Sequence, residues 1–170
     1  MADIKKYFPK LLLLEGGFVN DKDDKGGATK FGVTLAAWRE IGYDKDGDGD
    51  IDAHDIRQLS TEDALMVLKV AYWDRWRADA IKDQKVAEFL VDWVWTSGKW
   101  GIVIPQRVLG VDDDGRVGMQ TITAVNAADP ADLLYKLIGY RQKFTNEIVM
   151  DNPSQQKFLK GWTNRINSFA

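Results

Sequence analysis

The sequence predicts a mainly α single domain with a small β-hairpin near its N-terminus. Apolar residues recur at helical spacing along most of the chain, and the stretch 18–33 interrupts this pattern with Gly, Asp, Asn and Lys. A chain of 170 residues that is 45% hydrophobic and 29% charged suits one soluble globular domain with its own core.

The elements are expected in the following order. The apolar run before Gly16 forms a first helix that ends at Glu15, and 18–33 supplies short strands or a hairpin. Thr34 caps a short helix, and Ser60 opens another through a capping box with Asp63. The helices are expected over 4–15, 35–41, 53–59, 60–73, 84–96, 102–109, 118–127, 130–149 and 153–169.

Composition excludes several classes of function. A net charge of -3 with no Lys/Arg stripe argues against nucleic-acid binding. The chain has no cysteine and a single histidine, His54, so thiol chemistry and a zinc hydrolase site are excluded, and a Ser-His-Asp triad is disfavoured. No apolar run is long enough for a transmembrane segment, and the N-terminus does not read as a signal peptide. We expect a monomer made in the cytoplasm.

Glu15 stands at the end of the leucine run Leu11 to Leu14 and is followed at once by two glycines. A carboxylate beside such a run must be paired, exposed or kept protonated. A protonated carboxyl beside a leaving oxygen is what glycoside cleavage requires, and the leucines with Phe18 would favour that form. The glycines would leave room for a sugar. A solvated surface residue is the simpler interpretation of the helix taken alone.

Glycoside cleavage needs a second group, to position water or to stabilise the transition state. Asp24 and Thr29 follow Glu15 in the stretch DDKGGAT, and a hairpin that folds back over the helix end would bring both toward it. Ordinary turn chemistry also explains an Asp before Gly-Gly, so a role for Asp24 in shaping the turn stays open.

The segment DKDGDGDIDAHD has the residue order of a calcium-binding loop of the EF-hand type. Alternate aspartates, Gly49 for the sharp turn and the apolar Ile51 are in register, although the twelfth residue is Asp rather than Glu. A single loop favours a structural calcium ion over a sensor, and a solvated acidic turn is the alternative. The expected metal ligands are Asp44, Asp46, Asp48, Asp50 and Asp55.

The run EGGFVNDKDDKGGATKFGVT resembles the signature of glycoside hydrolase family 108, the N-acetylmuramidases of endolysin and secretion-activator type. The resemblance implies a lysozyme-like fold, with Glu15 as the catalytic acid. The same Glu, Asp, Thr order occurs in bacteriophage-type lysozymes, with the threonine one residue further on, and this makes Asp24 and Thr29 the remaining catalytic candidates.

The resemblance continues through AYWDRWRADAI, VAEFLVDWVW and SGKWGIVIPQRVLGVDDDGRVGMQT, which are similar to the family's predicted peptidoglycan-binding region. It divides the chain into a muramidase region, 1–80, and a helical binding region, 81–170, packed on the same core. Tryptophans can stack on sugars, but they are also core material. The candidate substrate contacts are Phe18, Asn20, Trp73, Asp92 and Trp95.

The resemblance implies a peptidoglycan hydrolase that cuts the β-1,4 bond between N-acetylmuramic acid and N-acetylglucosamine. Such an enzyme would act in the periplasm or cell wall after release. One alternative is a non-catalytic peptidoglycan-binding or secretion-associated adaptor with a vestigial site. A dockerin-like interaction module is another, although the single cation loop counts against it.

Overall fold

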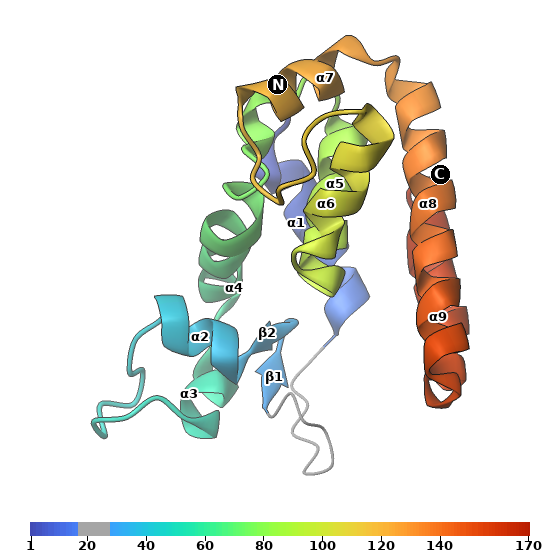
Figure 1. Ribbon diagram of the computed structural model, residues 1–170. Coiled ribbons are helices and arrows are strands. Elements are labelled where there is room, and N and C mark those ends of the chain that lie inside the picture. Colours follow the sequence, from blue (N-terminus) through green and yellow to red (C-terminus); the bar gives the residue numbers. More distant parts are fainter. Residues whose placement is uncertain (17–27) are drawn as a thin grey trace. The chain divides into compact units, whose positions relative to one another are not determined.

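The computed structural model describes residues 1–16 and 28–170 (Figure 1). The chain forms two compact units. The N-terminal unit comprises Ile4–Asp74, and the C-terminal unit comprises Met1–Asp3 together with Arg75–Ala170. The expected division at residue 80 stays a prediction, as does the shared core.

The N-terminal unit combines short helices with one hairpin (Figure 1). Its elements are α1 (Ile4–Glu15), β1 (Thr29–Lys30), β2 (Val33–Thr34), α2 (Leu35–Ile41), α3 (Ala53–Gln58), α4 (Thr61–Val67) and a π-helical segment, η1 (Leu68–Trp73). The two strands are antiparallel, and Thr29 pairs with Thr34. The Lys30 ammonium donates to the Arg57 carbonyl at 2.7 Å, which fastens the hairpin to α3.

Capping residues fix where these helices begin. The Thr34 side chain accepts the Ala37 N–H, so the last residue of β2 is also the N-cap of α2. Ser60 and Asp63 form the expected capping box at the start of α4. The expected α-helix 60–73 is interrupted, however, because the segment after Val67 is a π-helix.

All the secondary-structure elements of the C-terminal unit are helices. Its elements are η2 (Ala78–Ala80), α5 (Gln84–Ser97), α6 (Trp100–Leu109), α7 (Met119–Ala127), α8 (Pro130–Asp151), η3 (Pro153–Gln155) and α9 (Gln156–Asn167). The expected helix from Pro153 therefore begins with a 3-10 turn, which Asn152 caps by accepting the Ser154 N–H.

The core of the C-terminal unit is built around α5. Eight of the nine residues from Val86 to Val94 are buried, so this part of α5 is covered on every side. Helix α6 packs along it, and α8 and α9 run antiparallel beside each other (Figure 1). The Trp76 indole lies inside the same unit and donates to the Gly101 carbonyl at 3.2 Å.

The predicted fold class is confirmed: the chain is mainly α, with a small antiparallel hairpin near the N-terminus. Within residues 1–16 and 28–170, no helix has the length and apolarity that crossing a membrane would require.

Candidate functional site

Glu15 is the last residue of α1 and is half-buried. The helix ends there because Gly16, at a φ of 70°, turns the chain away while its N–H still bonds the Leu12 carbonyl at 3.3 Å. The leucine run does not form a continuous apolar wall. Leu11 is buried, but Leu13 is 87% exposed, as the helical period dictates.

The hairpin turn lies directly against the Glu15 carboxyl. The two central residues of the turn, Phe31 and Gly32, have φ values of 53° and 76°, which is the left-handed geometry of a tight two-residue hairpin. A Cβ added at Gly32 would lie 2.5 Å from Oε2 of Glu15. A side chain at position 32 would therefore displace the Glu15 carboxyl, and glycine lets the turn lie this close to it.

Thr29 lies in β1, half-buried, at the base of the same hairpin. The structure thus places two of the three catalytic candidates, Glu15 and Thr29, in the N-terminal unit. The third, Asp24, lies outside the described residues, and so do the substrate candidates Phe18 and Asn20.

The predicted cation loop lies between α2 and α3. Asp44 accepts the N–H groups of Gly47 at 2.6 Å and of Gly49 at 2.8 Å, and Gly49 has the left-handed φ of 99° that the turn requires. Carboxylate oxygens of Asp44, Asp46 and Asp48 lie within 4.8 Å of one another.

A second carboxylate group completes the loop. Oxygens of Asp50, Asp52 and Asp55 also lie within 4.8 Å of one another. Repulsion by Asp48 raises the pKa of the Asp50 carboxyl. Such crowding of carboxylates is what a hard divalent cation relieves, so the donor set fits calcium.

Asp55 holds the end of the loop in place. Its carboxylate accepts the Asp52 N–H at 2.7 Å and the Lys45 N–H at 2.6 Å, and these bonds lower its pKa. A carboxylate has about four lone-pair sites, so Asp55 can keep both bonds and still bind a cation. The Lys45 ammonium bonds Asp63 at 2.5 Å, which joins the loop to α4.

The three remaining substrate candidates differ in exposure. Trp95 is half-buried, whereas Trp73 and Asp92 are both 0% exposed. Asp92 accepts hydrogen bonds from Arg141 and Arg165, so its carboxylate joins α5 to α8 and α9. Contact of these residues with substrate stays a prediction, and the burial of Trp73 and Asp92 favours a role in the core.

Three features of these sites were not predicted from the sequence. Gly32 is in the family signature, but its contact with Glu15 depends on how the hairpin folds back. Asp52 occupies the ninth loop position, which the pattern itself could have indicated. Arg141 falls on the buried stripe of α8 one turn after Leu137, and a lone basic residue on an apolar stripe is a recognisable signal.

Comparison with known proteins agrees with this arrangement. Residues 8–98 match the family described as Glycosyl hydrolase 108, and residues 100–167 match the one described as Predicted Peptidoglycan domain. The solved "Structure of Brucella abortus SagA" is similar with a TM-score of 0.80 and 26% sequence identity, over 98% of this chain and 90% of that one. No curated protein matches the sequence.

The matched N-terminal segment covers more than half of the chain and contains both Glu15 and the hairpin that packs against it. The two family matches together support a glycoside hydrolase whose partner is peptidoglycan. The chain therefore belongs to glycoside hydrolase family 108.

Proposed function

We propose that this chain is an N-acetylmuramidase that cleaves the β-1,4 bond between N-acetylmuramic acid and N-acetylglucosamine, with Glu15 as the general acid. The contact between Glu15 and Gly32 supports the proposal most strongly. The carboxyl is half-buried at a helix end, and any side chain at position 32 would have to displace it, so the hairpin limits where the carboxyl can lie. Fixed position is the first requirement of a general acid.

In the proposed reaction Glu15 donates its proton to the glycosidic oxygen as the bond to the leaving sugar breaks. Charge then develops on the ring carbon, and water completes the hydrolysis. Asp24, together with Thr29, is the proposed group that holds or activates this water. The proposed site of action is the periplasm or cell wall, where this substrate lies.

The test is the loss of turbidity of purified peptidoglycan on addition of the protein. Glu15→Gln keeps the size of the side chain but cannot donate a proton as a carboxylic acid, so we expect its rate to fall on the order of 10²- to 10⁴-fold. Glu40→Gln is the matched control, because Glu40 is an exposed glutamate on α2. The control is expected to lyse the wall at the wild-type rate.

Equal lysis by wild type and Glu15→Gln would exclude Glu15 as the acid. Absence of lysis by the wild type on several wall types, together with retained binding to the wall, would instead favour the non-catalytic adaptor.

We also propose that the loop from Asp44 to Asp55 binds one structural calcium ion. Two groups of carboxylates and a backbone already turned by Gly49 support this role. Asp44, Asp46, Asp48 and Asp55 are the proposed side-chain ligands, with Asp50 at the position that usually contributes its carbonyl and Asp52 at the one that often acts through water. The ion would stabilise the loop and take no part in bond cleavage.

A further inference from the structure

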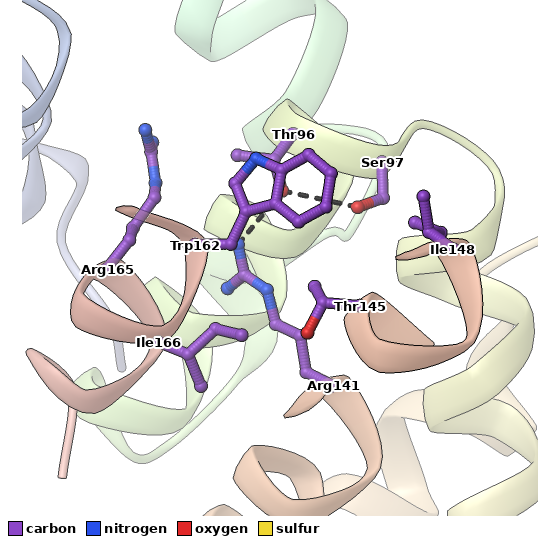
Figure 2. Close-up of a pocket in the computed structure, with 8 residues that line it drawn as sticks. All are labelled: Thr96, Ser97, Arg141, Thr145, Ile148, Trp162, Arg165 and Ile166. Atoms are coloured by element: carbon purple, nitrogen blue, oxygen red, sulfur yellow. Dashed lines mark hydrogen bonds between the residues drawn. The ribbon is translucent and has the colours of Figure 1, made fainter. Parts of the chain in front are cut away.

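A small cavity of about 100 Å³ lies among α5, α8 and α9 in the C-terminal unit, and its lining contains none of the catalytic candidates (Figure 2). Its wall combines two guanidinium groups, three hydroxyl groups, one indole and two isoleucines. The lining residues are Thr96, Ser97, Arg141, Thr145, Ile148, Trp162, Arg165 and Ile166.

Arg141 is held rigidly at this cavity. Its side chain is 3% exposed, and one Nη donates to Asp92 at 2.8 Å and to Thr96 at 2.9 Å. The guanidinium carbon also lies 5.2 Å from the ring centre of Phe89 and 5.8 Å from that of Trp93. Aromatic rings attract such a cation. The donor direction is therefore set before any ligand arrives, which reduces the entropy cost of binding.

Arg165 approaches the same carboxylate from α9. Its Nη donates to Asp92 at 2.8 Å, and its Nε donates at 3.1 Å to the other oxygen. Asp92 thus accepts hydrogen bonds from both arginines. A guanidinium has five N–H donors in a fixed fork, so it can hold Asp92 and a second acceptor at the same time.

The cavity wall favours an anion. Arg141 and Arg165 line it. Among the residues that the structure describes, no Asp or Glu lines the cavity. The hydroxyls of Thr96 and Ser97 are 3.3 Å apart beside Arg141, as Figure 2 shows, and add polar contacts on the same side. A planar guanidinium fork binds carboxylates and phosphates in two-point geometry, and a peptide stem of peptidoglycan ends in a carboxylate.

The size and the apolar part of the wall limit the ligand further. An engineered apolar cavity of about 150 Å³ holds a benzene ring, so a cavity of about 100 Å³ suits a carboxylate with a short apolar branch better than a substituted pyranose ring. Trp162, Ile148 and Ile166 supply the apolar contacts for that branch. Thr96 is exposed and Trp162 is half-buried, so the cavity is reached from the surface.

We propose that this cavity binds the terminal carboxylate of a peptide stem of peptidoglycan, with Arg141 and Arg165 as the anion contacts. The proposal rests on the proposed function, because it names the part of the wall polymer that the C-terminal unit recognises. Sugars are then recognised elsewhere on the protein. Asp92 positions the two arginines.

The experiment titrates the full-length ¹⁵N-labelled chain with N-acetylalanine and, separately, with N-acetylalanine amide, while indole N–H signals are followed by NMR. The Trp162 signal is assigned by its absence in Trp162→Phe. We expect it to shift with the acid at a dissociation constant on the order of 1 mM, because the ligand is very small. The amide, which lacks the negative charge, should bind at least tenfold more weakly.

Two variants locate the binding. Arg165→Gln removes one anion contact and leaves Asp92 bonded to Arg141, and Ser97→Leu fills the cavity without touching the ion pairs. Each should weaken binding of the acid at least tenfold. Trp100→Phe is the control, since Trp100 is a half-exposed tryptophan that does not line the cavity, and its affinity should equal the wild-type value.

A last comparison identifies the source of the carboxylate. Soluble wall fragments that carry peptide stems should displace N-acetylalanine, and the same fragments stripped of their peptides should not. Equal binding of acid and amide, no shift of the Trp162 signal, or unchanged affinity in both variants would overturn the proposal. None of these results depends on lysis, so they are separate from the test of Glu15.

Discussion

At the scale of single residues, the contact between Glu15 and Gly32 links a catalytic candidate to a backbone conformation. The hairpin turn approaches the carboxyl so closely that a methyl group would overlap it. The same residue has a left-handed φ of 76°. Two separate effects, lack of space and backbone strain, therefore disfavour other residues at position 32, and only the first concerns the proposed acid.

The variant Gly32→Ala separates these effects when it is compared with Gly110→Ala. Gly110 has a φ of 67° at the end of α6, but a Cβ there would meet nothing within 4 Å. Each substitution should lower the free energy of unfolding by about 1–2 kcal/mol, because alanine is strained in this region. Only Gly32→Ala should lose most of its wall-lysing activity, since its methyl displaces Glu15.

Chemical denaturation and the turbidity assay measure the two effects. Full activity in Gly32→Ala would mean that the carboxyl position fixed by the turn is not needed for the reaction.

The sequence indicates Glu15 as a candidate because its setting is local: a leucine run, a carboxylate and two glycines are adjacent. It did not identify the contact with Gly32, which depends on the hairpin returning to the end of α1. The sequence did not predict the burial of Asp92 either, because its partners Arg141 and Arg165 lie far along the chain.

At the scale of elements, Lys45 couples the cation loop to α4. Its backbone N–H bonds Asp55 at the end of the loop, and its ammonium bonds Asp63 in the capping box of α4. Burial opposes ionisation of Asp63, but hydrogen bonds from Lys45 and Ser60 outweigh this effect and hold its pKa below the usual value. The ionised carboxyl thus stabilises both elements.

This coupling predicts a dependence of stability on pH. Because the pKa of Asp63 is lowered in the folded chain, its contribution is complete above the unfolded value of about 3.9 and is lost as the pH falls through the folded value. Asp63→Asn should be about 1–2 kcal/mol less stable than wild type at pH 7, and the difference should shrink below about pH 4.

The comparison is made by urea denaturation across this pH range. Asp132→Asn is the control, because its pair with Lys136 on α8 is exposed and should contribute less than about 1 kcal/mol. A difference for Asp63→Asn that does not change between pH 7 and pH 3 would contradict the assigned role.

Helix starts were predictable from the sequence, whereas the π-helical turn was not. Thr34, Ser60 and Asp63 cap helices where the sequence indicates, because capping depends on residues three positions apart. The π-helix after Val67 has the Asp74 N–H bonded to the Lys69 carbonyl at 2.9 Å, five residues back. This widened turn accompanies complete burial of both Leu68 and Trp73, and burial is a tertiary effect.

At the scale of the whole molecule, the candidate sites lie in two different compact units. The N-terminal unit contains Glu15, the hairpin and the cation loop, and the C-terminal unit contains the cavity lined by Arg141 and Arg165. The family matches meet at residues 98 and 100, inside the C-terminal unit, so the boundary between families is not the boundary between compact units.

Calcium removal should lower the melting temperature of the whole chain. A ligand present at 100 times its dissociation constant adds about 2.7 kcal/mol to the free energy of unfolding, which corresponds to about 5–10 °C for a chain of this size. Calorimetry with calcium and with a chelator measures the change. Asp46→Asn/Asp48→Asn should abolish the response to calcium, and Asp112→Asn, an exposed acid outside the loop, should retain it. Identical melting curves with calcium and with chelator would favour the solvated acidic turn.

The reducing ends of the released wall fragments test the central claim most directly. After digestion of purified peptidoglycan, mass spectrometry should find N-acetylmuramic acid at the new reducing ends with the wild type, and no new ends above background with Glu15→Gln. New ends of N-acetylglucosamine, or 1,6-anhydro ends, would contradict a muramidase that works by hydrolysis. Unchanged release by Glu15→Gln would contradict the assignment of the acid.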